Sequence, residues 1–138
     1  MKFMKRANIY KASNVTFNPE TCGAVSYDWW TFTKMINGKL VFNKHAYSNT
    51  TRKHQSKVRS LLRELGLEID LTVDAPGGLQ RDTWTEQAVS SVQSRIDTLM
   101  AQLNNTRRKK ALDAERIQAL NELHKEKQEL TEFIASIN

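Results

Sequence analysis

Apolar and aromatic positions dominate residues 24–47 and predict two β-strands joined by a tight turn. Residues 24–36 are rich in Val, Tyr, Trp, Phe and Thr, which favour a pleated strand, and residues 39–47 form the expected return strand. On both segments the even-numbered positions are the more apolar set: Trp30, Phe32, Ile36, Leu40, Phe42 and Ala46.

The loop length of this hairpin follows from that alternation. One face collects both apolar sets only if the loop has an odd number of residues, so the pattern favours a three-residue loop, Ile36 to Gly38, with Gly38 in the left-handed conformation of a bulge. Asn37 and Gly38 taken alone favour a two-residue turn instead. With the three-residue loop, Trp29 points away from the core face.

A helix and a strand are predicted after the hairpin. Ser48 or Thr50 is a suitable N-cap, the helix runs to about Leu65, and Gly66 ends it because glycine adopts positive φ without penalty. One face of this helix carries His54, Val58, Leu61, Leu62 and Leu65. Residues 67–73 alternate apolar and polar side chains and predict a half-buried strand, with Leu67, Ile69, Leu71 and Val73 inward. Before the hairpin, residues 5–11 predict a short strand and residues 12–23 a loop.

The C-terminal part has the spacing of helices that pack on each other. A capping box, Thr83 to Glu86, opens a helix over residues 84–104, and a seam follows at Val89, Val92, Ile96, Leu99 and Leu103. The seam fails at Thr106, Lys110 and Asp113 and restarts in a second helix, residues 107–137. A fold-back of the two helices is favoured locally over a single long helix that pairs between chains, because the latter buries Lys110 and Asp113.

These elements predict an α+β fold. A small (β)ββαβ domain occupies residues 1–73, a linker residues 74–82, and an antiparallel, coiled-coil-like α-helical hairpin residues 83–138. The second helix is about 15 Å longer than the first at 1.5 Å per residue, so its end needs a partner. We expect that end to pack on the α+β domain or, slightly favoured, on a second copy in a homodimer, through Leu130, Phe133, Ile134 and Ile137.

The distribution of charge along the chain is more informative about function than the overall composition. The chain has 138 residues, a net charge of +6 and a single cysteine, Cys22, so no intrachain disulfide forms and a reducing cytoplasm suits it. Neither a signal peptide nor a membrane-spanning segment is recognised, and no membrane partner is expected. The whole positive excess lies in residues 1–82, and no Asp or Glu occurs between Asp28 and Glu64.

The acid-free stretch predicts a surface that binds nucleic acid, DNA or RNA. Clustered Lys and Arg side chains bind phosphates and release counterions. The candidate residues on the helix are Arg52, Lys53, Lys57, Arg59 and Arg63, with Arg52, Arg59 and Arg63 expected opposite the apolar face, and those on the hairpin are Lys34, Lys39, Lys44 and Trp29. The alternative is an ordinary solvated helix face. A second basic run, Arg107 to Lys110, is favoured as a solvated turn balanced by Asp113 and Glu115.

No catalytic, metal or cofactor motif stands out. His45, His54, His124 and Cys22 lack the spacing of a metal site, and His54 is expected to be a satisfied core histidine. We therefore expect a protein that is not an enzyme and that has no cofactor.

The string YSNTTRKHQSKVRSLLRELGLEIDL, preceded by DWWTFTKMINGKLVFNK, resembles small uncharacterised proteins of tailed bacteriophages over about residues 24–80. The resemblance implies a phage accessory protein that acts in the host cytoplasm, and it transfers no functional residues. Such proteins bind nucleic acid, mimic it, or block a host protein; the basic charge argues against mimicry. The sequence thus predicts a nucleic-acid-binding protein, or alternatively an inhibitor of a host defence or regulatory protein, with the helices as oligomerisation or docking face.

Overall fold

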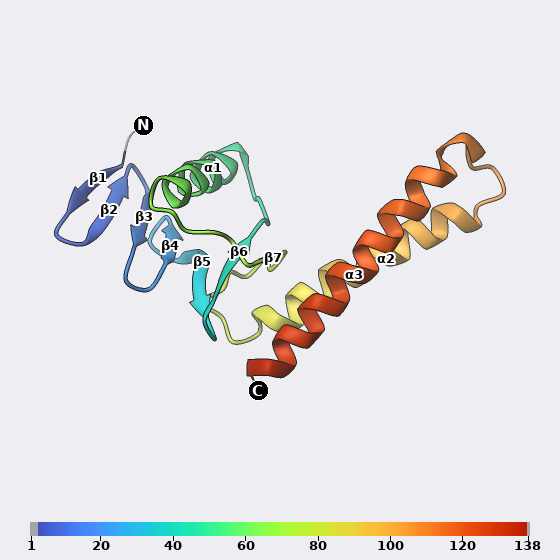
Figure 1. Cartoon of the computed structure of the whole chain (residues 1–138). Helices are drawn as coiled ribbons and strands as arrows, with labels where there is room; N and C mark the ends of the chain where they lie inside the picture. Colours follow the sequence, from blue (N-terminus) through green and yellow to red (C-terminus); the bar gives the residue numbers. More distant parts are fainter. Residues whose placement is uncertain (1–2, 138) are drawn as a thin grey trace. The chain divides into compact units, whose positions relative to one another are not determined.

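The computed structural model describes residues 3–137, which form an α+β protein with a seven-stranded mixed sheet and three α-helices (Figure 1). The chain divides into two compact units, Met1–Trp84 and Thr85–Asn138, which we call the sheet unit and the helical unit. The elements in chain order are β1 Met4–Arg6, β2 Ile9–Ala12, β3 Val15–Asn18, β4 Gly23–Ser26, β5 Trp30–Ile36, β6 Lys39–Asn43, α1 Asn49–Glu64, β7 Leu71–Val73, α2 Trp84–Asn104, the 3₁₀ turn η1 Lys110–Leu112 and α3 Asp113–Ile137.

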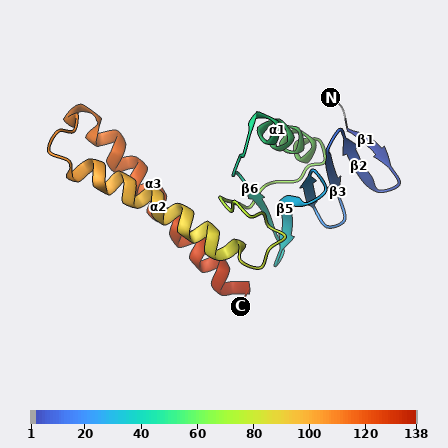
Figure 2. The ribbon, with the colours of Figure 1, turned by 180° about the vertical axis from the view of Figure 1, so that it is seen from behind.

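The sheet follows the chain, because its strands lie in the order β1 to β7. Each strand pairs antiparallel with the next, except that β6 and β7 are parallel and are connected through α1. Helix α1 covers one face of the sheet (Figures 1 and 2). The core lies between them and includes Phe17, Phe32, Phe42, Val58 and Leu62. Apolar burial between one helix and one sheet face therefore holds this unit together.

The sheet unit is richer in strands than the predicted (β)ββαβ domain. The predicted strand 5–11 is the β1–β2 hairpin, the predicted loop 12–23 contains β3, and the predicted strand 24–36 is β4 and β5 with a turn between them. The chain turns at Ala7, Ser13, Tyr27 and Asp28, each with positive φ. Few residues other than glycine adopt this conformation, so these turns carry no recognisable sequence signal.

The predicted three-residue loop of the central hairpin is wrong. Ile36 pairs directly with Lys39, so Asn37 and Gly38 form a two-residue turn with φ of 49° and 78°. The alternation of apolar residues is reversed within β5 instead: Thr31 pairs with Val25 and Thr33 with Ala24, which leaves Phe32 as the extra residue of a bulge. Because of the bulge, Phe32 and Thr33 are both buried although they are neighbours in sequence. The prediction from alternating apolar positions explained the same shift by an extra residue in the loop.

Helix α1 begins and ends where its capping residues predict. Ser48 is the N-cap and accepts a hydrogen bond from the amide of Thr51, and Gly66 follows the helix with a φ of 70°. The strand predicted over residues 67–73 is confined to Leu71–Val73. Residues 67–70 lie before the strand; at Asp70 the amide donates to the Leu40 carbonyl at 2.9 Å and the carboxylate accepts from the Leu40 amide at 2.8 Å.

Residues 74–82, interpreted from sequence as a linker, pack on the sheet. The side chain of Asn43 donates to the carbonyl of Ala75 at 2.8 Å and accepts from its amide at 3.0 Å. The amide of Leu79 donates to the carbonyl of Thr31 at 2.8 Å, and Leu79 is buried. This segment therefore belongs to the sheet unit.

In the helical unit α2 and α3 lie side by side and run in opposite directions (Figures 1 and 2). The guanidinium of Arg95 on α2 pairs with Glu126 on α3 at 3.0 Å, and the Lys127 ammonium donates to Gln93 at 2.6 Å. Helix α2 spans the predicted residues 84–104, whereas α3 begins at Asp113 and not at residue 107.

The later start of α3 changes the expected mismatch between the two helices. Helix α2 has 21 residues and α3 has 25, so the difference is about 6 Å and not the expected 15 Å. Leu130 and Phe133, expected to be exposed at an oligomer contact, are 3% and 6% exposed in the single chain. Ile134 and Ile137 are half-buried.

Candidate nucleic-acid interface

The outer side of α1 carries a row of cationic side chains. His54, Val58, Leu61 and Leu62 are buried and fix the orientation of the helix on the sheet. Thr51 and Gln55 are also buried. The exposed cations of the helix are Arg52, Lys53, Arg59 and Arg63, with Lys57 half-buried. We call these five residues the α1 stripe.

Three cations of the α1 stripe have no carboxylate partner within the part of the chain that the structure describes. Within residues 3–137, Arg52, Lys53 and Arg63 take part in no ion pair. The helix has no acidic residue in its first turn and only one acid, Glu64, at its end. The positive potential of these side chains is thus available to an anion from outside the chain.

Arg59 differs from its neighbours because it also packs on the core. Its guanidinium carbon lies 4.4 Å from the centre of the Phe42 ring, which is a cation–π contact. The sequence placed Arg59 opposite the apolar face together with Arg52 and Arg63, and Arg59 is exposed as they are, but its long side chain also reaches back to the sheet. Its removal therefore affects stability as well as surface charge.

A depression of about 510 Å³ lies beside the end of α1. Arg59 and Arg63 line it together with Leu62, Leu67, Glu68 and Ile69. Two guanidinium groups above an apolar floor suit a ligand that combines anionic and apolar parts, such as a sugar–phosphate chain. Glu68 opposes them with one negative charge.

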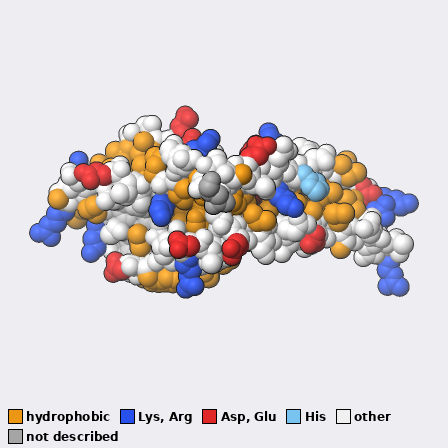
Figure 3. Space-filling model, turned by 90° about the horizontal axis from the view of Figure 1, so that it is seen from below, with side chains coloured by type: hydrophobic (Ala, Val, Ile, Leu, Met, Phe, Trp, Pro, Cys, Tyr) orange, Lys and Arg blue, Asp and Glu red, His pale blue; other side chains and the backbone are white. Residues whose placement is uncertain are grey.

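The structure separates the predicted hairpin cations from the α1 stripe. Lys34 pairs with Val41 and, with Lys39, alternates with the residues that face α1, so both point away from the helix. Lys44 follows β6 and is half-buried. The face drawn in Figure 3 shows Lys and Arg as separate groups, with Asp and Glu as well as apolar and uncharged side chains between them. The predicted single basic surface is thus divided between opposite faces of the sheet.

Two aromatic side chains are exposed at the β4–β5 turn. Trp29 is 56% and Tyr27 48% exposed, and the Tyr27 ring lies 5.4 Å from the ring of His54 on α1. Tyr47, in contrast, contacts Trp30 and donates to the carbonyl of Pro76. The exposed rings of Trp29 and Tyr27 are accessible for stacking on a base, whereas Tyr47 contacts residues 74–82 through Pro76.

A buried pair of Ser26 and His54 was missed by the sequence analysis. The Ser26 hydroxyl lies 2.7 Å from Nδ1 of His54, and both residues are almost fully buried. Burial lowers the pKa of His54 from its ordinary value of 6.5. The pair connects β4 to α1. No group of metal-ligating side chains occurs within residues 3–137.

The pKa of His54 makes stability depend on pH. Because the folded chain resists protonation, the unfolded chain binds the extra proton once the pH falls below 6.5. We expect the free energy of unfolding to fall between about pH 7 and pH 5, by up to about 1.4 kcal/mol per pH unit. Denaturant titrations of the wild type and of His54→Gln measure this, and equal pH slopes in both proteins would contradict it.

The basic run Arg107 to Lys110 lies in the α2–α3 connection. Arg108 pairs with Asp113 at 3.1 Å, and the carbonyl of Lys109 accepts from Arg116 at 3.2 Å. Asp113 also lies 3.6 Å from Arg116. Part of the charge in this run is therefore balanced within the helical unit, as the solvated-turn interpretation requires.

The fold and the candidate site define an α+β protein with a mixed sheet, one covering helix and a row of exposed cations on that helix. Comparison with protein-family models, with curated proteins and with solved structures found no match. In the described part of the chain, no helix combines the length and the apolar character needed to cross a membrane.

Proposed function

We propose that this protein is a non-enzymatic accessory protein that binds nucleic acid through the α1 stripe. The observation that carries the proposal is the set of exposed, unneutralised cations Arg52, Lys53 and Arg63 on one rigid helix. The resemblance to small phage proteins adds a setting, the cytoplasm of an infected host.

The physical basis is phosphate binding by fixed charges. Residues 52–63 of α1 extend over about 17 Å, because an α-helix rises 1.5 Å per residue. That length matches several successive phosphates of a nucleic-acid strand. Contacts to phosphates carry little sequence information, so the proposed binding is general and depends strongly on salt.

The experiment that tests the proposal removes charge without removing packing. We expect the triple variant Arg52→Gln, Lys53→Gln, Arg63→Gln to bind DNA and RNA more weakly, with a salt dependence of log K that is smaller by about 2 to 3. Arg59 is retained because of its contact with Phe42. Fluorescence anisotropy of a labelled oligonucleotide at several salt concentrations measures both quantities.

A matched control makes the same charge change elsewhere. The variant Arg107→Gln, Lys109→Gln, Lys110→Gln loses three cations from the helical unit and should change the affinity and the salt dependence much less. If both triple variants lose affinity equally, net charge and not the α1 stripe is responsible. If neither does, the proposed function is wrong.

A protein partner is the second candidate, in which the chain inhibits a host defence or regulatory protein. Exposed apolar side chains gather at the connection end of the helical unit, namely Met100 on α2, Leu112 in η1 and Ile117 on α3. Such side chains favour a protein contact, either with a host protein or with a second copy of the chain. Capture of a bacterial protein after nuclease treatment, abolished by Ile117→Glu, would support this function.

A further inference from the structure

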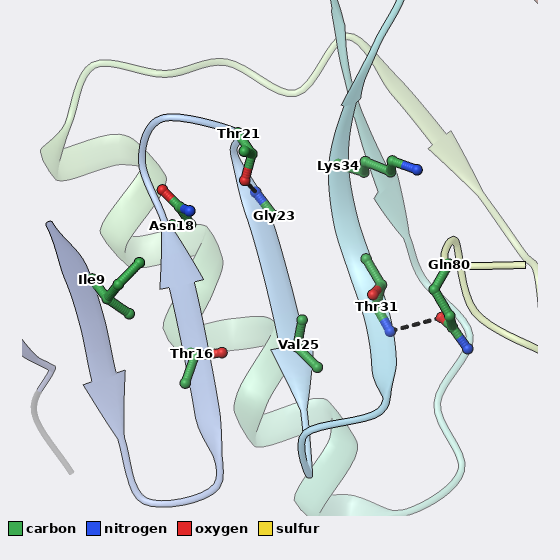
Figure 4. Close-up of a pocket in the computed structure, with 9 residues that line it drawn as sticks. All are labelled: Ile9, Thr16, Asn18, Thr21, Gly23, Val25, Thr31, Lys34 and Gln80. Atoms are coloured by element: carbon green, nitrogen blue, oxygen red, sulfur yellow. Dashed lines mark hydrogen bonds between the residues drawn. The ribbon is translucent and has the colours of Figure 1, made fainter.

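The face of the sheet that points away from α1 has its own surface chemistry. Val15 and Phe17 of β3 point into the core, so Thr16 and Asn18 point outward, and Thr16 pairs with Val25, which pairs with Thr31. Figure 4 shows these side chains on the near side of the strands, with α1 behind them. We call this surface the outer face.

A groove of about 490 Å³ crosses the outer face. Ile9 and Val25 supply apolar surface, while Thr16, Thr31 and Asn18 supply hydroxyl and amide groups (Figure 4). Gly23 lines the groove next to Thr21, and a Cβ atom there would lie 3.1 Å from the Thr21 hydroxyl oxygen, a tight contact.

One wall of the groove is held in place by hydrogen bonds. Oε1 of Gln80 accepts from the Thr31 amide at 2.9 Å, drawn as the dashed line in Figure 4, and its Nε2 donates to the carbonyl of Gly77 at 2.8 Å. The groove is therefore a defined feature of the sheet unit, and its wall does not have to be ordered when a ligand binds.

Four exposed cations lie at the two ends of the outer face. Arg6 and Lys11 pair with Ile9 and Thr16 and share their face, while Lys34 lines the groove and Lys39 is the partner of Ile36. Strands β1 to β6 contain no Asp or Glu. Within residues 3–137 none of the four cations forms an ion pair.

The spacing of these charges selects the kind of ligand. Neighbouring strands lie about 4.8 Å apart, so β1 and β6 are separated by about 24 Å. A single phosphate or carboxylate cannot reach both ends, whereas a polymer with repeating anionic groups can. Hydroxyl and amide side chains between the cations are typical of contacts to phosphate and sugar.

We propose that the outer face is a second nucleic-acid site, which takes one single strand across the sheet, perpendicular to the β-strands. The inference rests on the proposed function and deepens it. A single strand can lay its sugars into the groove over Ile9 and Val25, whereas a stiff duplex stays above it. No aromatic ring lines the groove, so phosphate contacts and not base stacking hold the strand.

Two sites on opposite faces give the sheet unit the capacity to hold two strands at once. The α1 stripe lies on the helix that covers one face, and the outer face is the other (Figure 4). One protein molecule then bridges two segments of nucleic acid, an activity that a single basic surface does not provide.

The test is the number of strands bound. Native mass spectrometry and titration calorimetry of the full chain with oligothymidine of about eight nucleotides, a length suited to one such site, count the bound strands. We expect two strands on the wild type. The outer-face variant Lys11→Gln, Lys34→Gln, Lys39→Gln should bind one, because losing three phosphate contacts lowers affinity by about 100-fold at roughly 0.1 M salt.

Controls separate this proposal from the proposed function. The variant Lys11→Arg, Lys34→Arg, Lys39→Arg keeps the charges and should still bind two strands. One strand on the wild type, unaffected by the outer-face variant, would overturn the second site and leave the α1 stripe in place. Loss of the same strand in both the outer-face and the α1 variants would also overturn it.

Three further outcomes are decisive. A wild type that binds no oligonucleotide overturns the proposed function and the second site together. A wild type whose bound strands are displaced equally well by poly-glutamate of equal charge shows a general polyanion surface and overturns the assignment to nucleic acid. Binding that is lost only in the outer-face variant supports the second site and overturns the role of the α1 stripe.

Discussion

Replacing Phe42 with alanine is expected to lower the free energy of unfolding of the sheet unit by about 4 kcal/mol. Phe42 is fully buried; its ring centre lies 6.2 Å from that of Phe32 in an edge-to-face arrangement and 4.4 Å from the guanidinium carbon of Arg59. The variant loses apolar burial, an aromatic contact and a cation–π contact, and it leaves a cavity that a β-strand cannot close. Denaturant titration measures the loss.

The control is a variant of an exposed residue on the water-facing side of α1. Lys53→Ala changes an exposed side chain and should alter the free energy of unfolding by less than about 0.5 kcal/mol. Similar denaturation midpoints for Phe42→Ala and Lys53→Ala would contradict the position of Phe42 at the centre of the core.

The second large effect is expected at Asn43. Its buried side chain donates to the carbonyl of Ala75 and accepts from the amides of Ala75 and His45. In Asn43→Ala the amides of Ala75 and His45 lose their acceptor, whereas the Ala75 carbonyl still accepts from the Gly78 amide at 2.9 Å. Each buried polar group left unsatisfied costs about 1 to 3 kcal/mol. We expect a loss of about 3 kcal/mol, and release of residues 74–82 from the sheet.

Limited proteolysis and denaturation together test this. Asn43→Ala should be cleaved near Arg81 faster than the wild type, while Asn49→Ala, which changes an exposed asparagine, should match the wild type. Equal cleavage of Asn43→Ala and the wild type would show that residues 74–82 are held by other contacts, such as Leu79.

Local signals account for what could be predicted from the sequence. Ser48 and Gly66 fix the ends of α1, and the apolar spacing of residues 84–104 fixes α2, because capping and periodicity act within a few residues. The bulge at Phe32 has no such signal. The bulge reverses which positions of β5 are buried. The apolar pattern therefore predicted a three-residue loop where the chain has a two-residue turn.

In the candidate site, too, local features could be predicted from the sequence and features that depend on the fold could not. The acid-free stretch of residues 29–63 identifies the cations, since charge is a property of the sequence. Strand register decides which cations share a surface. The register of β5 and β6 places Lys34 and Lys39 on the outer face. The Ser26 and His54 pair joins residues 28 positions apart and could be found only from the fold.

The sequential order of the strands has a consequence for how the chain folds during synthesis. As the chain leaves the ribosome from its N-terminus, each strand from β2 to β6 finds its finished neighbour immediately before it. Only β7 has to wait for α1, and it adds just three residues, Leu71–Val73, to the edge of the sheet. The six-stranded meander therefore forms from short loops with small closure entropy, and the last strand together with residues 74–82 closes the unit after the rest is in place.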